Sequence, residues 1–222
     1  MIVKVIIFDF DGTIAETLDT IVSITNRLAG EFGYKQTSLE ELLELKNLNS
    51  RQIIKRSGIS NLKLPFAIRK IKSELNKQIQ TLSPVPGIQA SLIELKRQGY
   101  RLGIISSNSK ENVTAFLNKN CLQELFDFVY SGSTLFGKDK VIKHVLRKER
   151  ITSEEVIYVG DETRDIEASK RTYVKVIAVS WGFNSKEALT SYNPDFLIHQ
   201  PSELINAIKN MHPQRVALEI GE

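Results

Sequence analysis

Two aspartates separated by one residue follow an apolar run near the start of the chain. Residues 3–8 are mostly β-branched or aromatic, and Asp9 and Asp11 come directly after them, ahead of Gly12 and Thr13. Side chains alternate along an extended chain, so the two carboxylates are expected to point the same way. Like charges held this close repel each other unless a cation or a proton compensates. Oxygen ligands favour Mg²⁺, and three histidines and one cysteine are too few for a nitrogen or sulfur site.

The same pair suits nucleophilic and acid–base chemistry. A carboxylate, with a reference pKa of about 3.9, is ionised at neutral pH and needs no separate base to attack phosphorus. A second carboxyl group nearby can protonate a leaving oxygen and later activate water. An Asp-Gly turn followed by a threonine helix cap is the structural alternative, and the repulsion between the two carboxylates argues against it.

The segment Asp9-Phe-Asp-Gly-Thr-Ile14 resembles the first motif, DxDGT(L/I), of the haloacid dehalogenase superfamily of phosphatases. The resemblance implies that Asp9 is a nucleophile that becomes a phospho-aspartate and that Asp11 is the general acid and base. It also implies substrate contacts at Gly12 and Thr13. Mg²⁺ would be held by Asp9 and the backbone carbonyl of Asp11, together with later acidic residues.

A hydroxyl ends the second predicted strand, residues 101–106, just before a helix predicted from about Lys110. A hydroxyl and free backbone N–H groups at a helix start can hold phosphate oxygens. The segment is similar to the family's second motif, which implies that the Ser106 hydroxyl and the Ser107 backbone bind the phosphate. Serines that merely cap the helix are the structural alternative.

A lysine begins another predicted helix, directly after Gly137. Lys138 or Lys140 could neutralise the nucleophile and the transferring phosphoryl group, as the family's third motif does. The preceding glycine favours Lys138, although the proline-rich run that often follows this lysine in relatives is missing. A solvated, lysine-rich helix face is the structural alternative.

Two more aspartates follow the predicted strand at residues 156–159, in the sequence Gly-Asp-Glu-Thr-Arg-Asp. This segment is similar to the fourth motif, GDxxxD. The similarity implies that Asp161 is a metal ligand beside Asp9, and that Asp165 steadies the metal directly or through water.

Apolar runs alternate with helical patterns along most of the chain. The predicted strands after the first are residues 101–106, 128–130, 156–159, 175–179 and 196–198, and helices are expected to begin near residues 110, 138 and 163. This alternation predicts an α/β fold with a Rossmann-like, doubly wound parallel sheet. Ligands bind beyond the carboxyl ends of strands in such sheets, which is where the polar motifs fall.

Residues 18–82 have a helical rather than a strand-like period. The pattern predicts an all-helical cap inserted into a core of residues 1–17 and 83–210, with a tail at 211–222. Ser38 and Ser50 are expected to cap helices, and the basic residues of the last cap helix, Arg69, Lys70, Lys72 and Lys77, are expected to face away from its apolar stripe. Arg51 resembles an arginine of related caps and is a candidate ligand for a substrate carboxylate, with a solvated surface position as the alternative.

The composition limits the kinds of partner that we expect for this protein. The net charge of +4 comes from 30 basic and 26 acidic residues spread along the chain, which argues against nucleic acid as a partner. The opening apolar run is too short to span a membrane, and a single cysteine fits a reducing compartment. We therefore expect a cytoplasmic protein, a monomer or homodimer, that acts on a small phosphorylated metabolite.

The motifs together predict a Mg²⁺-dependent phosphomonoester hydrolase similar to phosphoglycolate phosphatases. A phosphosugar mutase of the same superfamily is the nearest alternative, because it shares these motifs. A receiver-like phospho-aspartate signalling module is more remote, since receivers place their phospho-acceptor after the third strand, where this chain has Ser131-Gly-Ser. A catalytically silent phosphate-binding protein is disfavoured, because every catalytic position is filled.

Overall fold

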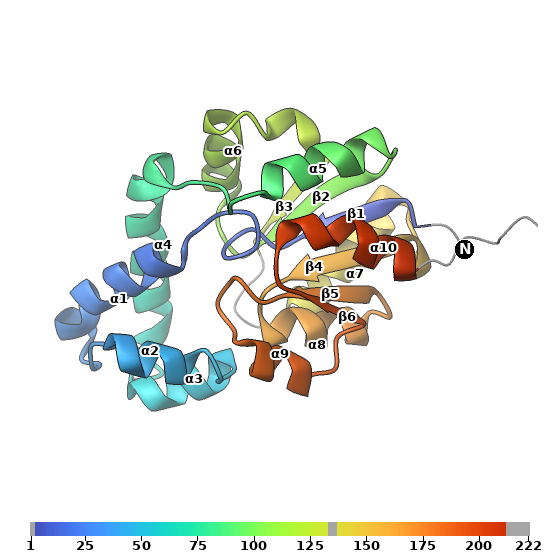
Figure 1. Cartoon of the computed structure of the whole chain (residues 1–222). Helices are drawn as coiled ribbons and strands as arrows, with labels where there is room; N and C mark the ends of the chain where they lie inside the picture. The colour runs from blue at the N-terminus through green and yellow to red at the C-terminus, as the bar shows by residue number, and fades with distance from the viewer. Residues whose placement is uncertain (1–2, 133–136, 212–222) are drawn as a thin grey trace, which may run out of the picture.

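The computed structural model of the protein describes residues 3–132 and 137–211. Its centre is a six-stranded parallel sheet with the strand order β3-β2-β1-β4-β5-β6 (Figure 1). The strands are β1 (Val5–Phe8), β2 (Arg101–Ser106), β3 (Phe128–Ser131), β4 (Val156–Gly160), β5 (Lys175–Val179) and β6 (Phe196–Ile198). The order reverses between β1 and β4, which is the doubly wound arrangement that the sequence predicts.

Helices cover both faces of the sheet, and this explains why β1 is apolar at every position. Ile6 and Phe8 belong to the core shared with α5, α6 and α10, whereas Val5 and Ile7 pack on the opposite face with α7 and α8. The helices of the sheet layer are α5 (Ile88–Arg97), α6 (Lys110–Lys119), α7 (Lys138–Glu149), α8 (Thr163–Arg171), α9 (Lys186–Ser191) and α10 (Leu204–Met211). β1 is therefore a strand buried on both faces.

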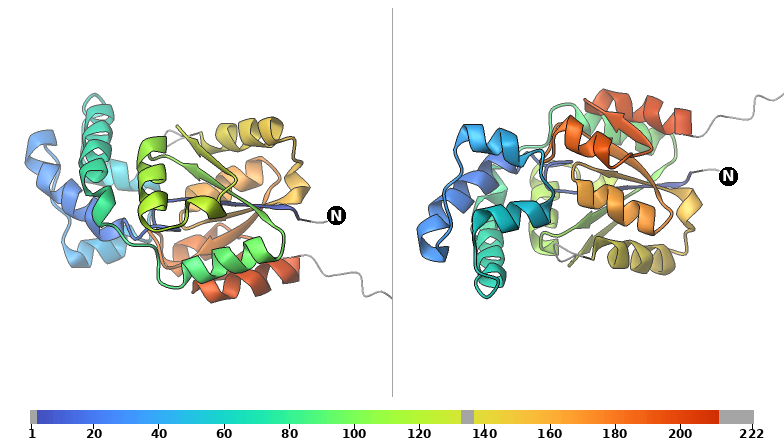
Figure 2. Two further views of the ribbon diagram at one scale, coloured as in Figure 1. Left: turned by 90° about the horizontal axis from the view of Figure 1, so that it is seen from above. Right: turned by 90° about the horizontal axis from the view of Figure 1, so that it is seen from below.

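Four helices between β1 and α5 form a separate group beyond the carboxyl ends of the central strands (Figures 1 and 2). They are α1 (Leu18–Phe32), α2 (Leu39–Leu45), α3 (Ser50–Ser57) and α4 (Leu64–Gln78). Two chain segments join this group to the core and pair with each other: Ala15 bridges to Pro84, and the Val85 N–H donates to the Ile14 carbonyl at 2.9 Å.

Some expectations need correction. Asn49, not Ser50, caps α3: its side-chain oxygen accepts from the Gln52 N–H at 3.0 Å, and Ser50 is the first residue of the helix. Helices α9 and α10 were not predicted, and Met211 lies in α10 rather than in a tail. The rest of the predicted tail, residues 212–222, lies outside the described residues. Within the described ranges, no helix has the length and apolar character to cross a membrane.

Candidate active site

Three buried aspartates meet where the strand order reverses. Asp9 follows β1, Asp161 follows β4, and Asp165 lies in the first turn of α8. Phe8 and Val159 are register partners in neighbouring parallel strands, so the residues that follow them leave the sheet side by side. Carboxylate oxygens of the three aspartates lie within 4.8 Å of one another. The sequence-predicted acidic cluster is thus brought together in space.

Lys138 contributes a positive charge to this cluster. Its Nζ donates to Asp9 Oδ2 at 2.8 Å and to Asp165 Oδ1, and its side chain is 3% exposed. Burial alone would lower the pKa of Lys138, but the carboxylates of Asp165 and Asp9 outweigh it and hold the pKa well above its usual value. Lys140, the alternative, is exposed on the same helix. The structure therefore brings Lys138 to the aspartates.

Asp161 is fixed by two hydrogen bonds. Thr13 Oγ1 donates to Asp161 Oδ1 and the Phe183 N–H donates to Asp161 Oδ2, both at 2.7 Å. Burial and then neighbouring carboxylates raise the pKa of Asp161 well above its ordinary value. Burial also raises the pKa of Asp165 to about 6, although Lys138 opposes the shift. Both shifts reflect negative charge crowded into a site screened from water.

This donor set fits a hard divalent cation. Asp9, Asp161 and Asp165 offer carboxylate oxygens, which are the ligands that Mg²⁺ and Ca²⁺ prefer. Three carboxylates against the single charge of Lys138 also leave an excess of negative charge, and a buried charge is stable only when it is compensated. A metal held by these aspartates would provide that compensation.

Asp11 faces a cavity instead of the acidic cluster. Its side chain is partly exposed, and the Asn108 side-chain nitrogen lies 3.4 Å from Asp11 Oδ1. Burial by the surrounding protein, and then the charge of Asp9, raise the pKa of Asp11 to about 7. A carboxyl group with this pKa can both give and take a proton at neutral pH.

Gly12 lies at a close approach between the first motif and Asp161. Its φ of 77° is in the left-handed region, and a Cβ there would lie 2.3 Å from Asp161 Oδ2. Gly12 and Thr13 therefore lie against the Asp161 carboxylate and fix its position, and the substrate contact expected for them stays a prediction.

Ser106 is the last residue of β2, and Ser107, which follows it, lines the same cavity as Asp11. Ser106 is buried, and its Oγ accepts a hydrogen bond from the Asn108 N–H at 2.9 Å. The Ser107 carbonyl accepts from Lys72 Nζ, which reaches over from α4, at 2.6 Å. The phosphate contacts expected for the two serines stay predictions.

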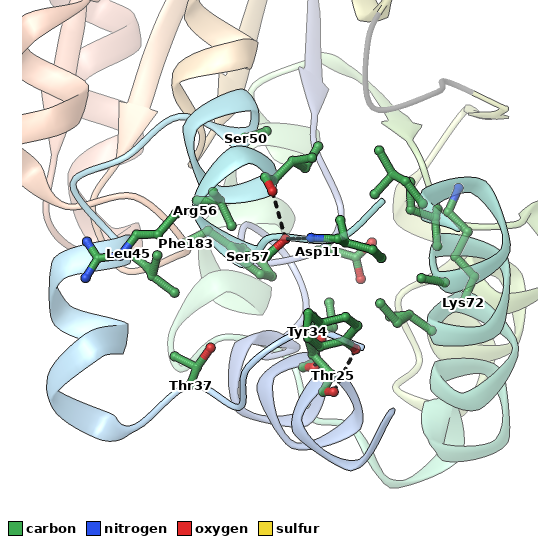
Figure 3. Close-up of a pocket in the computed structure, with 18 of the residues that line it drawn as sticks. Asp11, Thr25, Tyr34, Thr37, Leu45, Ser50, Arg56, Ser57, Lys72 and Phe183 are labelled. Atoms are coloured by element: carbon green, nitrogen blue, oxygen red, sulfur yellow. Dashed lines mark hydrogen bonds between the residues drawn. The ribbon is translucent and has the colours of Figure 1, made fainter. Parts of the chain in front are cut away.

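A cavity of about 580 Å³ lies between the four inserted helices and the core. Figure 3 shows Asp11 in its wall, between Lys72 of α4 and the Ser50 end of α3. Arg51 is exposed and is not among the described residues that line this cavity, whereas Ser50, its neighbour in sequence, is. The structure thus does not place the Arg51 side chain at the cavity.

The loop between α2 and α3 is hydrogen-bonded to the core loop after β5. Asn184 Nδ2 donates to the Lys46 and Leu48 carbonyls at 3.0 and 2.9 Å, and the Ser185 N–H donates to the Lys46 carbonyl at 2.8 Å. Ser50 Oγ adds a bond to Glu162 Oε2 at 3.3 Å. Ser50 and Glu162 also line the cavity, so these contacts lie along one side of it.

A family model described as haloacid dehalogenase-like hydrolase matches residues 6–179, which extend from β1 through β5. The chain belongs to this family. It is 35% identical to a phosphoglycolate phosphatase of Synechococcus elongatus, over 95% of this chain and all of that protein. It is 25% identical to pyrophosphatase PpaX of Bacillus cereus, over 96% of this chain and 99% of that protein.

The fold is also that of solved relatives. A crystal structure of a predicted phosphatase from Clostridium acetobutylicum superposes with a TM-score of 0.81 at 22% identity, covering 95% of this chain and all of that one. The resemblance inferred from the four motifs is confirmed. Membership of the haloacid dehalogenase-like hydrolases also sets aside the receiver-like alternative.

Three residues of this hydrolase site were missed in the sequence. Lys72 was expected to face away from the apolar stripe of α4, yet it lies four residues after Ile68 and therefore on the same helical face. Asn108 lies next to the serines of the second motif and Arg164 lies within the fourth motif, and both line the cavity. Arg164 Nη2 pairs with Glu162 Oε1 at 2.5 Å.

Proposed function

We propose that the protein is a Mg²⁺-dependent phosphomonoester hydrolase that works through a phospho-aspartate on a small phosphorylated metabolite. The observation that carries the proposal is the pair of contrasting carboxyl groups: Asp9, buried and bonded to Lys138 at 2.8 Å, and Asp11, whose pKa is raised to about 7. Phosphoglycolate is the first substrate to test, because the Synechococcus relative is named a phosphoglycolate phosphatase.

The two carboxyl groups divide the proposed reaction. A carboxylate oxygen of Asp9 attacks phosphorus, the bond from phosphorus to the leaving oxygen breaks, and protonated Asp11 gives that oxygen its proton. Asp11, now ionised, takes a proton from water as the water oxygen attacks the phospho-aspartate. The bond from phosphorus to Asp9 then breaks, which releases phosphate and restores both groups.

Other residues bind and neutralise the phosphoryl group. Lys138 offsets negative charge beside Asp9, the Ser106 hydroxyl and the Ser107 backbone orient phosphoryl oxygens, and Gly12 and Thr13 contact the substrate. Mg²⁺ would be held by the Asp9, Asp161 and Asp165 carboxylates and the Asp11 backbone carbonyl, and when bound it stabilises charge that develops on the phosphoryl oxygens.

The inserted helices complete the proposed enzyme. We assign residues 18–82 to a cap that covers the leaving group, with residues 1–17 and 83–210 as the catalytic core. Arg51 is retained as a cap cation that would reach a substrate carboxylate only after a rearrangement, because it is exposed in this structure. We place the protein in the cytoplasm, as a monomer or homodimer without a nucleic-acid partner.

Phosphate release from a panel of phosphomonoesters tests this function. The purified protein should release phosphate with Mg²⁺ and lose that activity in excess chelator, and Asp161→Ala should need far more Mg²⁺. Release that is undiminished by chelator would contradict the metal requirement. Release that needs a sugar bisphosphate primer, with little free phosphate, would instead indicate the mutase.

A further inference from the structure

The cavity above Asp11 is larger than a two-carbon leaving group requires. Its volume of about 580 Å³ lies within the range of about 300–1,000 Å³ typical of pockets for drug-sized ligands. It extends from Asp11 and Asn108 at the core to side chains of all four inserted helices. A substrate with its phosphorus at Asp9 and a glycolate-sized leaving group beside Asp11 would leave most of this space unused.

The wall of the cavity is mainly apolar where the leaving group would lie. Each of the four helices contributes aliphatic side chains to it, among them Ile21, Leu45, Ile53, Ile54, Ile68 and Ile71. All six remain partly exposed although they belong to apolar helix faces. Apolar surface left open in this way gains free energy when an apolar group covers it, at about 25 cal/mol for each Å².

The lysine and arginine side chains that line the cavity already form ion pairs or hydrogen bonds. Lys35 pairs with Glu41 at 2.5 Å, and Arg56 pairs with Glu44, so a second anionic group on a substrate would have to compete with a carboxylate at either place. Lys72 donates to a backbone carbonyl and lies at the core end, near Asp11 (Figure 3). The polar groups suited to a phosphate therefore lie at one end of the cavity, next to an apolar body.

We propose that the preferred substrate is a phosphomonoester whose leaving group is mostly apolar, a medium-length alkyl chain or a ring, seated among α1, α3 and α4. This inference rests on the phosphomonoesterase function proposed above and specifies its substrate class. Each methylene that moves from water to an apolar wall contributes about 0.8 kcal/mol, which corresponds to roughly fourfold in kcat/KM.

A series of n-alkyl phosphates from ethyl to octyl tests the proposal. Their leaving alkoxides have nearly equal basicity, so differences in kcat/KM report how the enzyme accommodates the chain. We expect kcat/KM to rise by roughly two- to fourfold for each methylene until the cavity is full, with phosphoglycolate near ethyl phosphate. A flat or falling series, with phosphate still released, would overturn this proposal alone. No release from any ester would overturn the proposed function with it.

Matched variants locate the effect. Ile54→Asn puts a polar group into the cavity wall and should lower the ratio of hexyl to ethyl phosphate kcat/KM by roughly fivefold. Leu43→Asn makes a similar change on α2 at a position that is 68% exposed and outside the lining, and it should leave the ratio unchanged. Ala67→Phe should abolish the rise with chain length, because Ala67 is buried in the wall and a larger side chain there fills the space for the chain. Equal ratios in Ile54→Asn and Leu43→Asn would contradict the placement.

Discussion

Asp9 and Asp11 are separated by one residue but have different surroundings. Asp9 is 2% exposed and is hydrogen-bonded to Lys138 and to the Phe10 N–H, whereas Asp11 faces the cavity, with the Asn108 side-chain nitrogen 3.4 Å away. One carboxyl group is therefore held in place by a cation, and the other has its pKa raised to about 7. Substitutions of Asp9 and of Asp11 should therefore block different steps of the reaction.

Asp9→Asn removes the anionic nucleophile, so even single-turnover phosphate release should vanish. Asp11→Asn keeps the nucleophile but loses the proton donor and the base. An aryl phosphate has a good leaving group that needs little protonation, so it should still phosphorylate Asp9 slowly in this variant. Mass spectrometry with Mg²⁺ should then show one added phosphoryl group. Phosphoryl label in the Asp9→Asn protein, or on another residue, would refute the assignment.

Lys138 should matter for stability as well as for activity. Lys138→Met leaves Asp9 and Asp165 buried without their cation, and breaking a buried ion pair from one side typically lowers the free energy of unfolding by about 3–5 kcal/mol. Lys140→Met changes an exposed lysine of the same helix and should have little effect. Urea unfolding in chelator and in Mg²⁺ measures both, and we expect Mg²⁺ to offset part of the loss. Equal unfolding midpoints for the two variants would argue against this role.

At the scale of elements, local patterns predicted most of the fold. The apolar runs gave all six strands, and Gly33 and Gly58 end α1 and α3 with the left-handed backbone that glycine favours. The sequence analysis assigns the N-cap of α3 to Ser50 instead of Asn49, because both residue types cap helices well. The structure decides for Asn49, which forms a capping box with Gln52. The six residues of α9 are too few to show a helical period.

The contacts of the candidate site depend on how distant segments dock, which local patterns do not encode. The four motifs identified Asp9, Asp161, Asp165 and Lys138 because each follows a strand or begins a helix, and the sheet brings those ends together. Lys72 meets Ser107 only because α4 docks against the end of β2, and that approach joins residues 35 apart in sequence. The size of the cavity is likewise a property of four helices packed together.

The ion pair between β2 and α7 should make stability depend on pH. Glu149 accepts from Tyr130 Oη and from Arg101 Nη2, both at 2.7 Å, and these contacts, the tyrosine bond first, lower the pKa of Glu149 from 4.5. A carboxyl group with a lowered folded-state pKa contributes its stability in full above the unfolded-state pKa and loses it as the pH falls through the folded-state value.

Glu149→Gln should therefore flatten the loss of stability below about pH 4.5, because the variant has no proton to take up at this position. Thermal unfolding between neutral pH and pH 3 measures the effect. Glu124→Gln, at an exposed position, is the control and should keep the wild-type slope. The same acid slope in wild type and Glu149→Gln would show that the pair contributes nothing to the pH dependence.

At the scale of the whole molecule, the described inserted helices touch the core at several places. The first is the paired connectors around Ala15 and Pro84, the second is the set of bonds between residues 46–48 and the Asn184–Ser185 loop, and Lys72 of α4 adds a bond to the Ser107 carbonyl. The first is a covalent and hydrogen-bonded joint. The second is not covalent and its hydrogen bonds can break, so a substrate should enter when this side opens and the connectors bend.

Locking the second contact should stop turnover. Asn47 Oδ1 accepts from Ser185 Oγ at 2.5 Å, so Asn47→Cys with Ser185→Cys, made in a Cys121→Ser background, places two thiols for a disulfide. We expect the oxidised protein to lose at least about tenfold of its turnover, because the cap can no longer open, and a thiol reductant to restore it. Each single-cysteine variant should behave the same before and after oxidation, which separates locking from oxidative damage. Wild-type turnover in a fully cross-linked protein would show that substrate and product pass without opening at this contact, and the connectors at Ala15 and Pro84 would then not act as a hinge.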